Sequence, residues 1–334
     1  MDNMNINDNV KAAAEKIVPE LLPDCDVKRL PTVCSPELFR ERLAGADDES
    51  VIVLADYILS QRNEFLQGAA NIAVSEIAKR IKNAETIYAV FDKTLAKIYP
   101  NVVSGNAVIF LDESRANRFV EEYNKKSNGK ARLVTFKGEQ ISELFMTLTR
   151  FGIEFVEIEP TLCKIRYHQK QLFKTDFDSV SDPAVNFAML RFLQMQVRNE
   201  DPKVMKILER AMLSGIGSAV VACMGMTING RFEALLITDK RDGSKWIPCF
   251  TDTSEIQETY TTIPAIATLL MSSQVVTVNF TELERFMNME GVAGVVMNIG
   301  GFGMRLTRQT CRMIISAVKR SRAENQQGEN NDNI

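Results

Sequence analysis

Histidine and tryptophan are nearly absent from this chain of 334 residues, which contains one of each. The single histidine, His168, has no second histidine beside it, and zinc sites need about four clustered ligands. The six cysteines are scattered without the C-x-x-C spacing of metal or redox sites. The sequence therefore predicts no metal, no cofactor and no thiol–imidazole pair for catalysis, and its free thiols indicate a reducing cytosol.

Long apolar runs and large basic blocks are missing as well. The longest apolar stretches, 216–226 and 292–304, contain glycines and fall short of the ~18 residues that a membrane span needs. Residues 1–10 have neither the basic nor the apolar part of a secretory signal. The 40 basic and 43 acidic residues nearly balance, and no basic block exceeds Lys319-Arg320 with Arg322. We therefore expect a soluble, cytoplasmic protein that binds neither membrane nor nucleic acid.

What the sequence does contain is one pattern that occurs twice. A strand-like run leads into a helix-like run, a second strand and helix follow, and an apolar run closes each copy. The matching segments are 107–112 and 246–252, 133–144 and 275–283, and 155–158 and 294–297. A duplication of this size predicts two copies of one small α+β unit.

Composition and turn residues divide the chain into five regions. These are a disordered start (1–9), a helical N-terminal region (10–83), repeat one (84–170), repeat two (181–320) and a disordered tail (321–334). The two ends have almost no apolar side chains whose burial could offset the entropy lost on ordering. The predicted fold class is α+β, with two related α/β units built on small mixed sheets and preceded by the helical N-terminal region.

Local signals predict several element boundaries in and before repeat two. Asp182-Pro183 and Asp201-Pro202 are typical helix starts, and Asn229-Gly230 is typical of a two-residue hairpin turn. The second of those helices is expected to stop at Ser214-Gly215. A last basic helix is expected over 307–320, with one apolar face made by Cys311, Ile314, Ile315 and Val318.

The stretch Asp242–Asp252, DGSKWIPCFTD, resembles the signature of the SseB family, bacterial proteins named for enhanced serine sensitivity. The strand that ends at Asn298 is also similar to that family, although Ile299 replaces the proline that often follows the asparagine. The resemblance covers roughly 184–318 and, in degenerate form, 84–165. It implies an α+β domain of unassigned biochemistry, for which effects on amino-acid metabolism or protein–protein contact are the usual suggestions.

Six residues of repeat two form the candidate binding site, namely Trp246, Pro248, Phe250, Thr251, Asp252 and Asn298. At Phe250–Asp252 a strand is expected to pass into a helix, whose free amides could bind an anion. The structural alternative is that Phe250 packs, Thr251 or Asp252 caps the helix and Pro248 marks an edge strand. No catalytic residue is predicted, because Cys249 has no base near it in the sequence.

The favoured function is a non-catalytic binding or regulatory module whose partner is an unidentified protein or small metabolite. The alternative is an enzyme or sensor acting on an amino acid or related metabolite, motivated by the family name and by Cys249, Thr251 and Asp252. A third hypothesis is an oligomerising scaffold, based on the expected edge strand at Pro248 and the glycine-rich segment 300–303. The oligomeric state stays open.

The methionines of the helices before repeat two favour either core packing or a pliable groove; they are Met189, Met195, Met205 and Met212.

Overall fold

The computed structural model describes residues 36–60, 67–93, 97–102, 104–127, 130–163, 165–175, 177, 179–198 and 201–331. The chain forms two compact units. The first contains the chain up to Lys93 together with Tyr99–Leu148 and Ile153–Thr175, and the second contains Thr94–Ile98, Thr149–Gly152 and all residues from Asp176 onward. The expected disordered start and the expected helical N-terminal region as far as Ser35 lie outside the described residues.

In the described part of the chain, three helices precede the first sheet: α3 (Pro36–Gly45), α4 (Asp48–Ser60) and α5 (Gln67–Lys82). The buried residues of α5, which are Ala70, Ala73, Ile77 and Ile81, recur every three or four positions and form its apolar face. Arg80 of α5 ties the helices together, because its guanidinium pairs with Asp48 at 2.6 Å and donates to the carbonyl of Leu43 at 2.7 Å. The prediction of a helical region before repeat one is confirmed over these residues.

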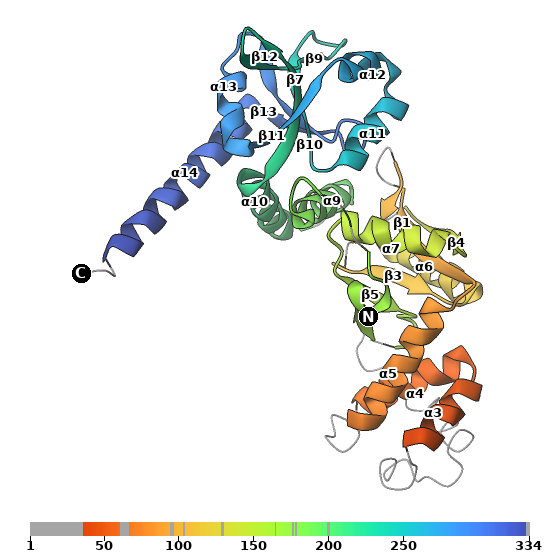
Figure 1. The fold of residues 1–334 in the computed structure, drawn as a ribbon. Coiled ribbons are helices and arrows are strands. Elements are labelled where there is room, and N and C mark those ends of the chain that lie inside the picture. Colours follow the sequence, from red (N-terminus) through yellow and green to blue (C-terminus); the bar gives the residue numbers. More distant parts are fainter. Residues whose placement is uncertain are drawn as a thin grey trace. The chain divides into compact units, whose positions relative to one another are not determined.

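The sheet of the first unit contains β1 (Thr86–Asp92), β2 (Tyr99–Pro100), β3 (Ala107–Phe110), β4 (Ala131–Lys137), β5 (Phe155–Ile158) and β6 (Arg166–His168). Its strands lie in the order β4-β1-β3-β5-β6, with β2 against the end of β1. Among the described strands of this sheet, only β3 and β5 pair in parallel. Helix α6 (Glu113–Ser127) connects β3 to β4, α7 (Gln140–Arg150) connects β4 to β5, and the short α8 (Gln169–Leu172) follows β6 (Figure 1).

The second unit starts with helices α9 (Pro183–Val197) and α10 (Pro202–Ser218). Its strands are β7 (Val220–Ile228), β8 (Arg231–Ala234), β9 (Ile237–Thr238), β10 (Lys245–Phe250), β11 (Gln274–Asn279), β12 (Val292–Met297) and β13 (Met304–Thr307). Helices α11 (Thr253–Thr262) and α12 (Pro264–Met271) follow β10, whereas η3 (Phe280–Leu283) and α13 (Glu284–Met287) follow β11. The last element is α14 (Arg308–Asn331).

The two sheets have the same topology. The order β11-β7-β10-β12-β13 repeats the order β4-β1-β3-β5-β6, with helical connections at the same two places. In each sheet the two strands that come third and fourth pair in parallel and the other neighbours pair antiparallel. The predicted α+β class with two related units on mixed sheets is therefore confirmed.

Pro248 is not on an edge strand, so that prediction is wrong. Strand β10 is the central strand of its sheet, between β7 and β9 on one side and β12 on the other. The pairing with β9 ends at Trp246 and the pairing with β7 begins at Cys249. Pro248, which has no N–H to donate, falls in this interruption of the ladder, and the sheet thereby accommodates a proline in its middle.

Two helices run further than the local signals predict. Helix α10 continues through Gly215 and Gly217 because Gly217 contacts α14, where an added Cβ would lie 2.7 Å from Val318 Cγ2 and 2.8 Å from Ile314 Cγ2. Helix α14 continues past Arg320 to Asn331, through alanine, glutamate and glutamine residues that favour helix. The expected disordered tail is therefore helical over its described part.

Other local signals are confirmed or corrected by the structure. Asn229 and Gly230 both have positive φ, 52° and 75°, as the predicted hairpin turn requires. Asp182 and Asp201 cap α9 and α10. Strand β6 lies at the end of the predicted repeat one, and His168 caps the first turn of helix α8. No helix in the described part of the chain has the length and hydropathy that a bilayer crossing demands.

Candidate functional site

Five of the six predicted site residues are packed inside the second unit. Phe250, Thr251, Asp252 and Asn298 have no exposed surface, and Pro248 is also buried. Trp246 alone is half-buried. Asp252 begins helix α11 and its Oδ1 accepts a hydrogen bond from the amide of Glu255 at 3.0 Å. The capping interpretation of this turn is therefore confirmed.

The polar groups of the turn bond to one another in a buried polar cluster that consists of Asn186, Thr251, Asp252 and Asn298. The hydroxyl of Thr251 donates to Asp252 Oδ2 at 3.0 Å and accepts from Asn298 Nδ2 at 2.8 Å. Asn298 Oδ1 accepts from the backbone amide of Thr251 at 3.0 Å, and Asn186 Nδ2 reaches Asp252 Oδ2 at 3.2 Å. The cluster fulfils the requirement that buried polar groups be bonded, and it gives an anion no access to this turn.

Arg150 completes this region with charge, although the sequence gives no signal for it. Its guanidinium pairs with three carboxylates: Nε lies 3.3 Å from Asp252, Nη2 lies 2.5 Å from Glu255 and Nη1 lies 3.4 Å from Glu258. Glu255 is fully buried, and burial raises the pKa of its carboxyl to about 8 although Arg150 opposes the shift. Lys97 pairs with Glu258 at 3.1 Å at the outer side of this group.

Cys249 is not placed to act as a nucleophile. Its side chain is fully buried, and burial holds the pKa of the thiol well above its ordinary value, so the reactive thiolate does not form near neutral pH. Thr251 and Asp252 are equally inaccessible. The three residues that motivated an enzyme at this cluster are therefore closed to a substrate.

The glycine-rich segment after β12 is a close packing site rather than a loose turn. A Cβ on Gly301 would lie 2.3 Å from Glu255 Oε2, and a Cβ on Gly300 would lie 2.4 Å from Thr259 Oγ1. Both glycines let this segment pass directly over helix α11. The methionines of the preceding helices also serve packing, because Met189, Met195 and Met212 are buried.

Trp246 lines a small pocket of about 200 Å³. The guanidinium of Arg305 lies 5.0 Å from the centre of the indole ring and 2.7 Å from Asp239. Hydrogen bonds from Arg241 and Arg305 hold the pKa of Asp239 well below its usual range. The other lining residues are Ile237, Val296, Ile299 and Gly303. A cation, an anion and an aromatic face thus meet at one small pocket.

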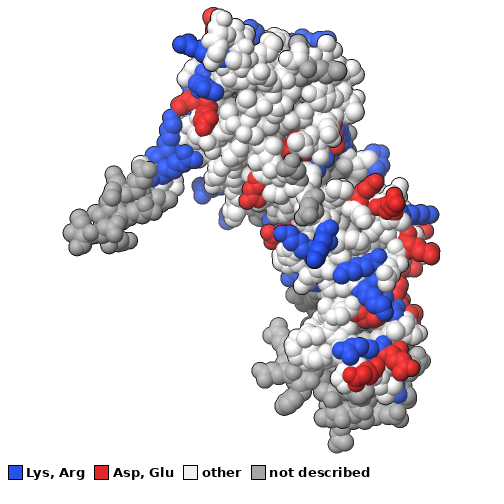
Figure 2. All heavy atoms as spheres, in the orientation of Figure 1, with Lys and Arg blue, Asp and Glu red and all other residues white. Residues whose placement is uncertain are grey.

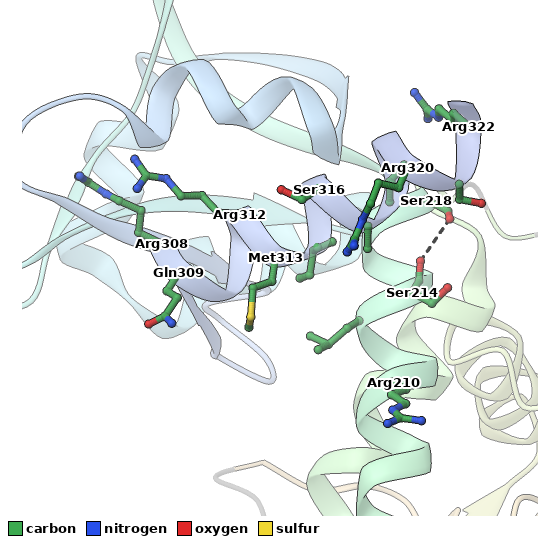
Figure 3. A pocket seen from close by; sticks show the side chains of 15 residues that line it. Arg210, Ser214, Ser218, Arg308, Gln309, Arg312, Met313, Ser316, Arg320 and Arg322 are labelled. Carbon is green, nitrogen blue, oxygen red and sulfur yellow. Dashed lines mark hydrogen bonds between the residues drawn. The ribbon is translucent and has the colours of Figure 1, made fainter. Parts of the chain in front are cut away.

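A larger hollow, the α10–α14 groove, lies between those two helices and has a volume of about 1190 Å³. Figure 3 shows Arg210 on α10 and Arg308, Arg312 and Arg320 along α14. The lining residues are Arg210, Leu213, Ser214, Ser218, Arg308, Gln309, Arg312, Met313, Ile314, Ser316, Ala317, Val318, Arg320, Ser321 and Arg322. Figure 2 shows the basic side chains gathered on α14 before its grey end. The sequence predicts the basic helix but not that α10 lies against it.

Metal and family comparisons add little to this geometry. Across the residues that the structure describes, no three histidine, cysteine or carboxylate side chains are arranged to hold a metal ion. No protein-family model matches the chain. No curated protein matches it either. Among solved structures the chain is similar to "Anabaena Tic22 (protein transport)", with 11% identity over 65% of this chain and 92% of that chain and a TM-score of 0.18. So low a score carries no argument about function, and the SseB resemblance stays a prediction.

Proposed function

We propose that this protein is an SseB-like, non-catalytic binding module of the bacterial cytoplasm and that its second unit holds a protein partner in the α10–α14 groove. The groove itself supports the proposal. None of its lining residues is a histidine, cysteine or carboxylate, so the four serines on its walls have no base among the lining side chains to activate them. The groove is thus suited to contact rather than to reaction.

The size and walls of the groove favour a protein over a metabolite. Its volume of about 1190 Å³ exceeds the roughly 300–1,000 Å³ of small-molecule pockets. Two helices form its walls, and Leu213, Ile314 and Val318 give it an apolar floor. An open trough between helices is a common binding place for a segment of another protein.

The test fills the groove without disturbing the core. Ala317 lines the groove and is exposed, so Ala317→Trp projects a bulky side chain into it. Ala323→Trp is the matched control, since Ala323 is exposed on the same helix and does not line the groove. In affinity capture from the native host, with quantification against wild type, we expect Ala317→Trp to lose partners that Ala323→Trp retains. Identical partner sets for both variants would overturn the proposal.

The Trp246 pocket supports a second candidate function, the sensing of a small metabolite. Its 200 Å³ lies below the usual range of small-molecule pockets, so only a molecule as small as an amino acid would fit, and Arg305 and Asp239, which pair with each other at 2.7 Å, bring opposite charges to it. Because Trp246 is the only tryptophan, its fluorescence reports on this pocket. A specific ligand at 100 times its Kd should also stabilise the protein by about 2.7 kcal/mol.

The sensor is tested by titrating wild type with an amino-acid panel that includes serine. We expect one ligand to change Trp246 emission and raise the melting temperature, and Arg305→Gln to weaken that response. Arg231→Gln, at an exposed hairpin position of the same unit, should leave the response intact. A panel that changes neither emission nor melting temperature removes this second candidate.

A further inference from the structure

We infer that the α10–α14 groove binds an acidic amphipathic helix of a partner protein, an inference that rests on the function proposed above and specifies the chemistry of the partner.

The first reason is positive charge that the described residues of the protein do not neutralise. Five arginines line the groove and no aspartate or glutamate does. Among the described residues, Arg210, Arg320 and Arg322 pair with no carboxylate. Their neighbour Lys319 does pair, with Glu284 at 2.6 Å, so the absence is a property of the groove and not of the whole helix. A partner that brings carboxylates would complement this potential and gain in association rate.

The other two arginines are fixed in place but retain donors. Arg308 Nη2 donates to the carbonyl of Met289 at 3.0 Å and also to that of Val292, and Arg312 Nη2 donates to Asn288 Oδ1 at 3.1 Å. A guanidinium has five N–H donors, so these bonds leave others for a carboxylate. Such held arginines lose less conformational entropy on binding than free ones, which favours a specific contact.

The second reason is an apolar strip between the arginines. Met313 is 55% exposed on α14, and Ala317 and Ser316 beside it are small. On α10, outside the residues that line the groove, Ile207 is also 67% exposed. An exposed apolar strip flanked by charge is the complement of a helix with one apolar face and acidic borders.

The third reason is that the groove is already formed. Gly217 lets α10 approach Val318 and Ile314 closely, and Cys311, Ile314 and Ile315 anchor α14 in the core. Two helices fixed side by side present ridges and grooves into which a third helix can pack. The small side chains of Ser214, Ser218 and Ala317 leave room for the backbone of that helix.

The same lining argues against nucleic acid. No aromatic residue lines the groove, so unpaired bases have no surface on which to stack. A phosphate backbone has no apolar surface that could pack against the apolar strip. A protein helix uses both the arginines and the strip, whereas a polyanion uses only the arginines.

The experiment measures binding of labelled peptides to the full chain by fluorescence anisotropy. The probe is an amphipathic peptide with leucines on one helical face and glutamates along both borders of that face. One control peptide replaces the glutamates with lysines, and a second replaces the leucines with serines. We expect only the acidic amphipathic peptide to bind well, and added salt to weaken its binding.

Charge reversal in the groove tests the location. Arg210→Glu combined with Arg320→Glu should weaken binding by about tenfold, the loss of some 1.4 kcal/mol. Arg231→Glu combined with Lys240→Glu makes the same change of charge at exposed positions outside the groove and should leave Kd unchanged. Equal effects of the two double variants, or equal binding of the acidic and the lysine peptides, would overturn the inference.

Two further arms separate this inference from the proposed function. Tighter binding of an oligouridine or of phosphatidylserine vesicles, abolished by the groove reversal, would assign the groove to a polyanion instead. If Ala317→Trp loses its cellular partners while no acidic peptide binds, the groove is a protein site of different chemistry. If Ala317→Trp keeps all its partners, the proposed function falls and this inference falls with it.

Discussion

The two units place the same turn in the same sheet and stabilise it with different chemistry. In the first unit the residue after β5 is Glu159, fully buried with φ 47°, and in the second the residue after β12 is Asn298, fully buried with φ 51°. Glu159 Oε1 accepts from the amides of Leu111 at 2.8 Å and Asp112 at 3.2 Å, whereas Asn298 Oδ1 accepts from the amide of Thr251 at 3.0 Å. The fold requires an acceptor there, and an amide or a carboxylate can supply it.

The helix after the turn supplies the cation in the first unit, whereas it supplies the carboxyl groups in the second. Asp112 caps α6 and bonds the amide of Arg115, and Asp252 caps α11 and bonds the amide of Glu255. In the first unit Arg115 on the helix pairs with Glu159 at 2.9 Å. In the second unit the helix supplies the carboxylate, and Arg150, far away in the sequence, supplies the cation. The turn residues Thr251 and Asp252 therefore serve the fold.

The largest expected loss of stability follows removal of the cation beside the turn in each unit. Arg150→Ala leaves the buried carboxylate of Asp252 without its cation and the buried carboxyl of Glu255 without its hydrogen-bond donor, and should destabilise the second unit by about 3–5 kcal/mol. Arg115→Ala should cost less, about 1–3 kcal/mol, because Glu159 keeps its two backbone donors. Hydrogen exchange resolved along the chain measures each unit separately. Equal losses in both units would contradict the exchange of charges described above.

A smaller loss of stability is expected when the hydrogen-bond acceptor Asn298 is removed. Asn298→Ala leaves the buried amide of Thr251 without its bond and forces alanine into positive φ, for a cost of about 2–4 kcal/mol. Asn298→Gly loses the acceptor but tolerates the backbone, so it should cost about 1–3 kcal/mol. Urea unfolding followed by Trp246 emission compares the two variants. If glycine is as costly as alanine, the left-handed backbone contributes nothing at this position.

The smallest expected effect is a dependence on pH that only the second unit shows. The carboxyl of Glu255 has a pKa of about 8 when folded and an ordinary value of 4.5, so the folded state binds the extra proton between these values. Its contribution to stability is complete below about pH 4.5 and is lost as the pH rises through about 8, at no more than about 1.4 kcal/mol per pH unit. Glu255→Gln should flatten the urea midpoint over this range. In the first unit Arg115 takes the equivalent position and does not titrate there, so a matching slope in that unit would count against the assignment.

The sequence predicted what local chemistry decides and missed what distant chain segments decide. The caps at Asp182 and Asp201 and the turn at Asn229-Gly230 each depend on a few adjacent residues, and all three predictions are confirmed. The predicted end of α10 was wrong because Gly217 serves a close contact with the distant helix α14 and does not end its own helix.

The candidate site was likewise predicted where adjacent residues determine it and missed where distant segments meet. The strand-to-helix turn was visible in the string that ends at Asp252, and the structure shows a buried cluster there. Asn186 and Arg150, which complete that region, come from segments whose proximity no local pattern reveals. The α10–α14 groove was missed because its arginines belong to two helices separated by most of repeat two.

The buried thiols give each unit its own reporter of spontaneous opening. Cys163 lies in the first unit, and Cys223, Cys249 and Cys311 lie in the second, all within the interior. Burial raises the pKa of Cys163 and of Cys311 to about 12, so a thiol reagent can modify them only while the surrounding structure is transiently unfolded. With Cys25 and Cys34 replaced by serine, the labelling rates at Cys163 and at Cys311 measure how often each unit opens and exposes its interior. Equal rates would indicate that the two units open together.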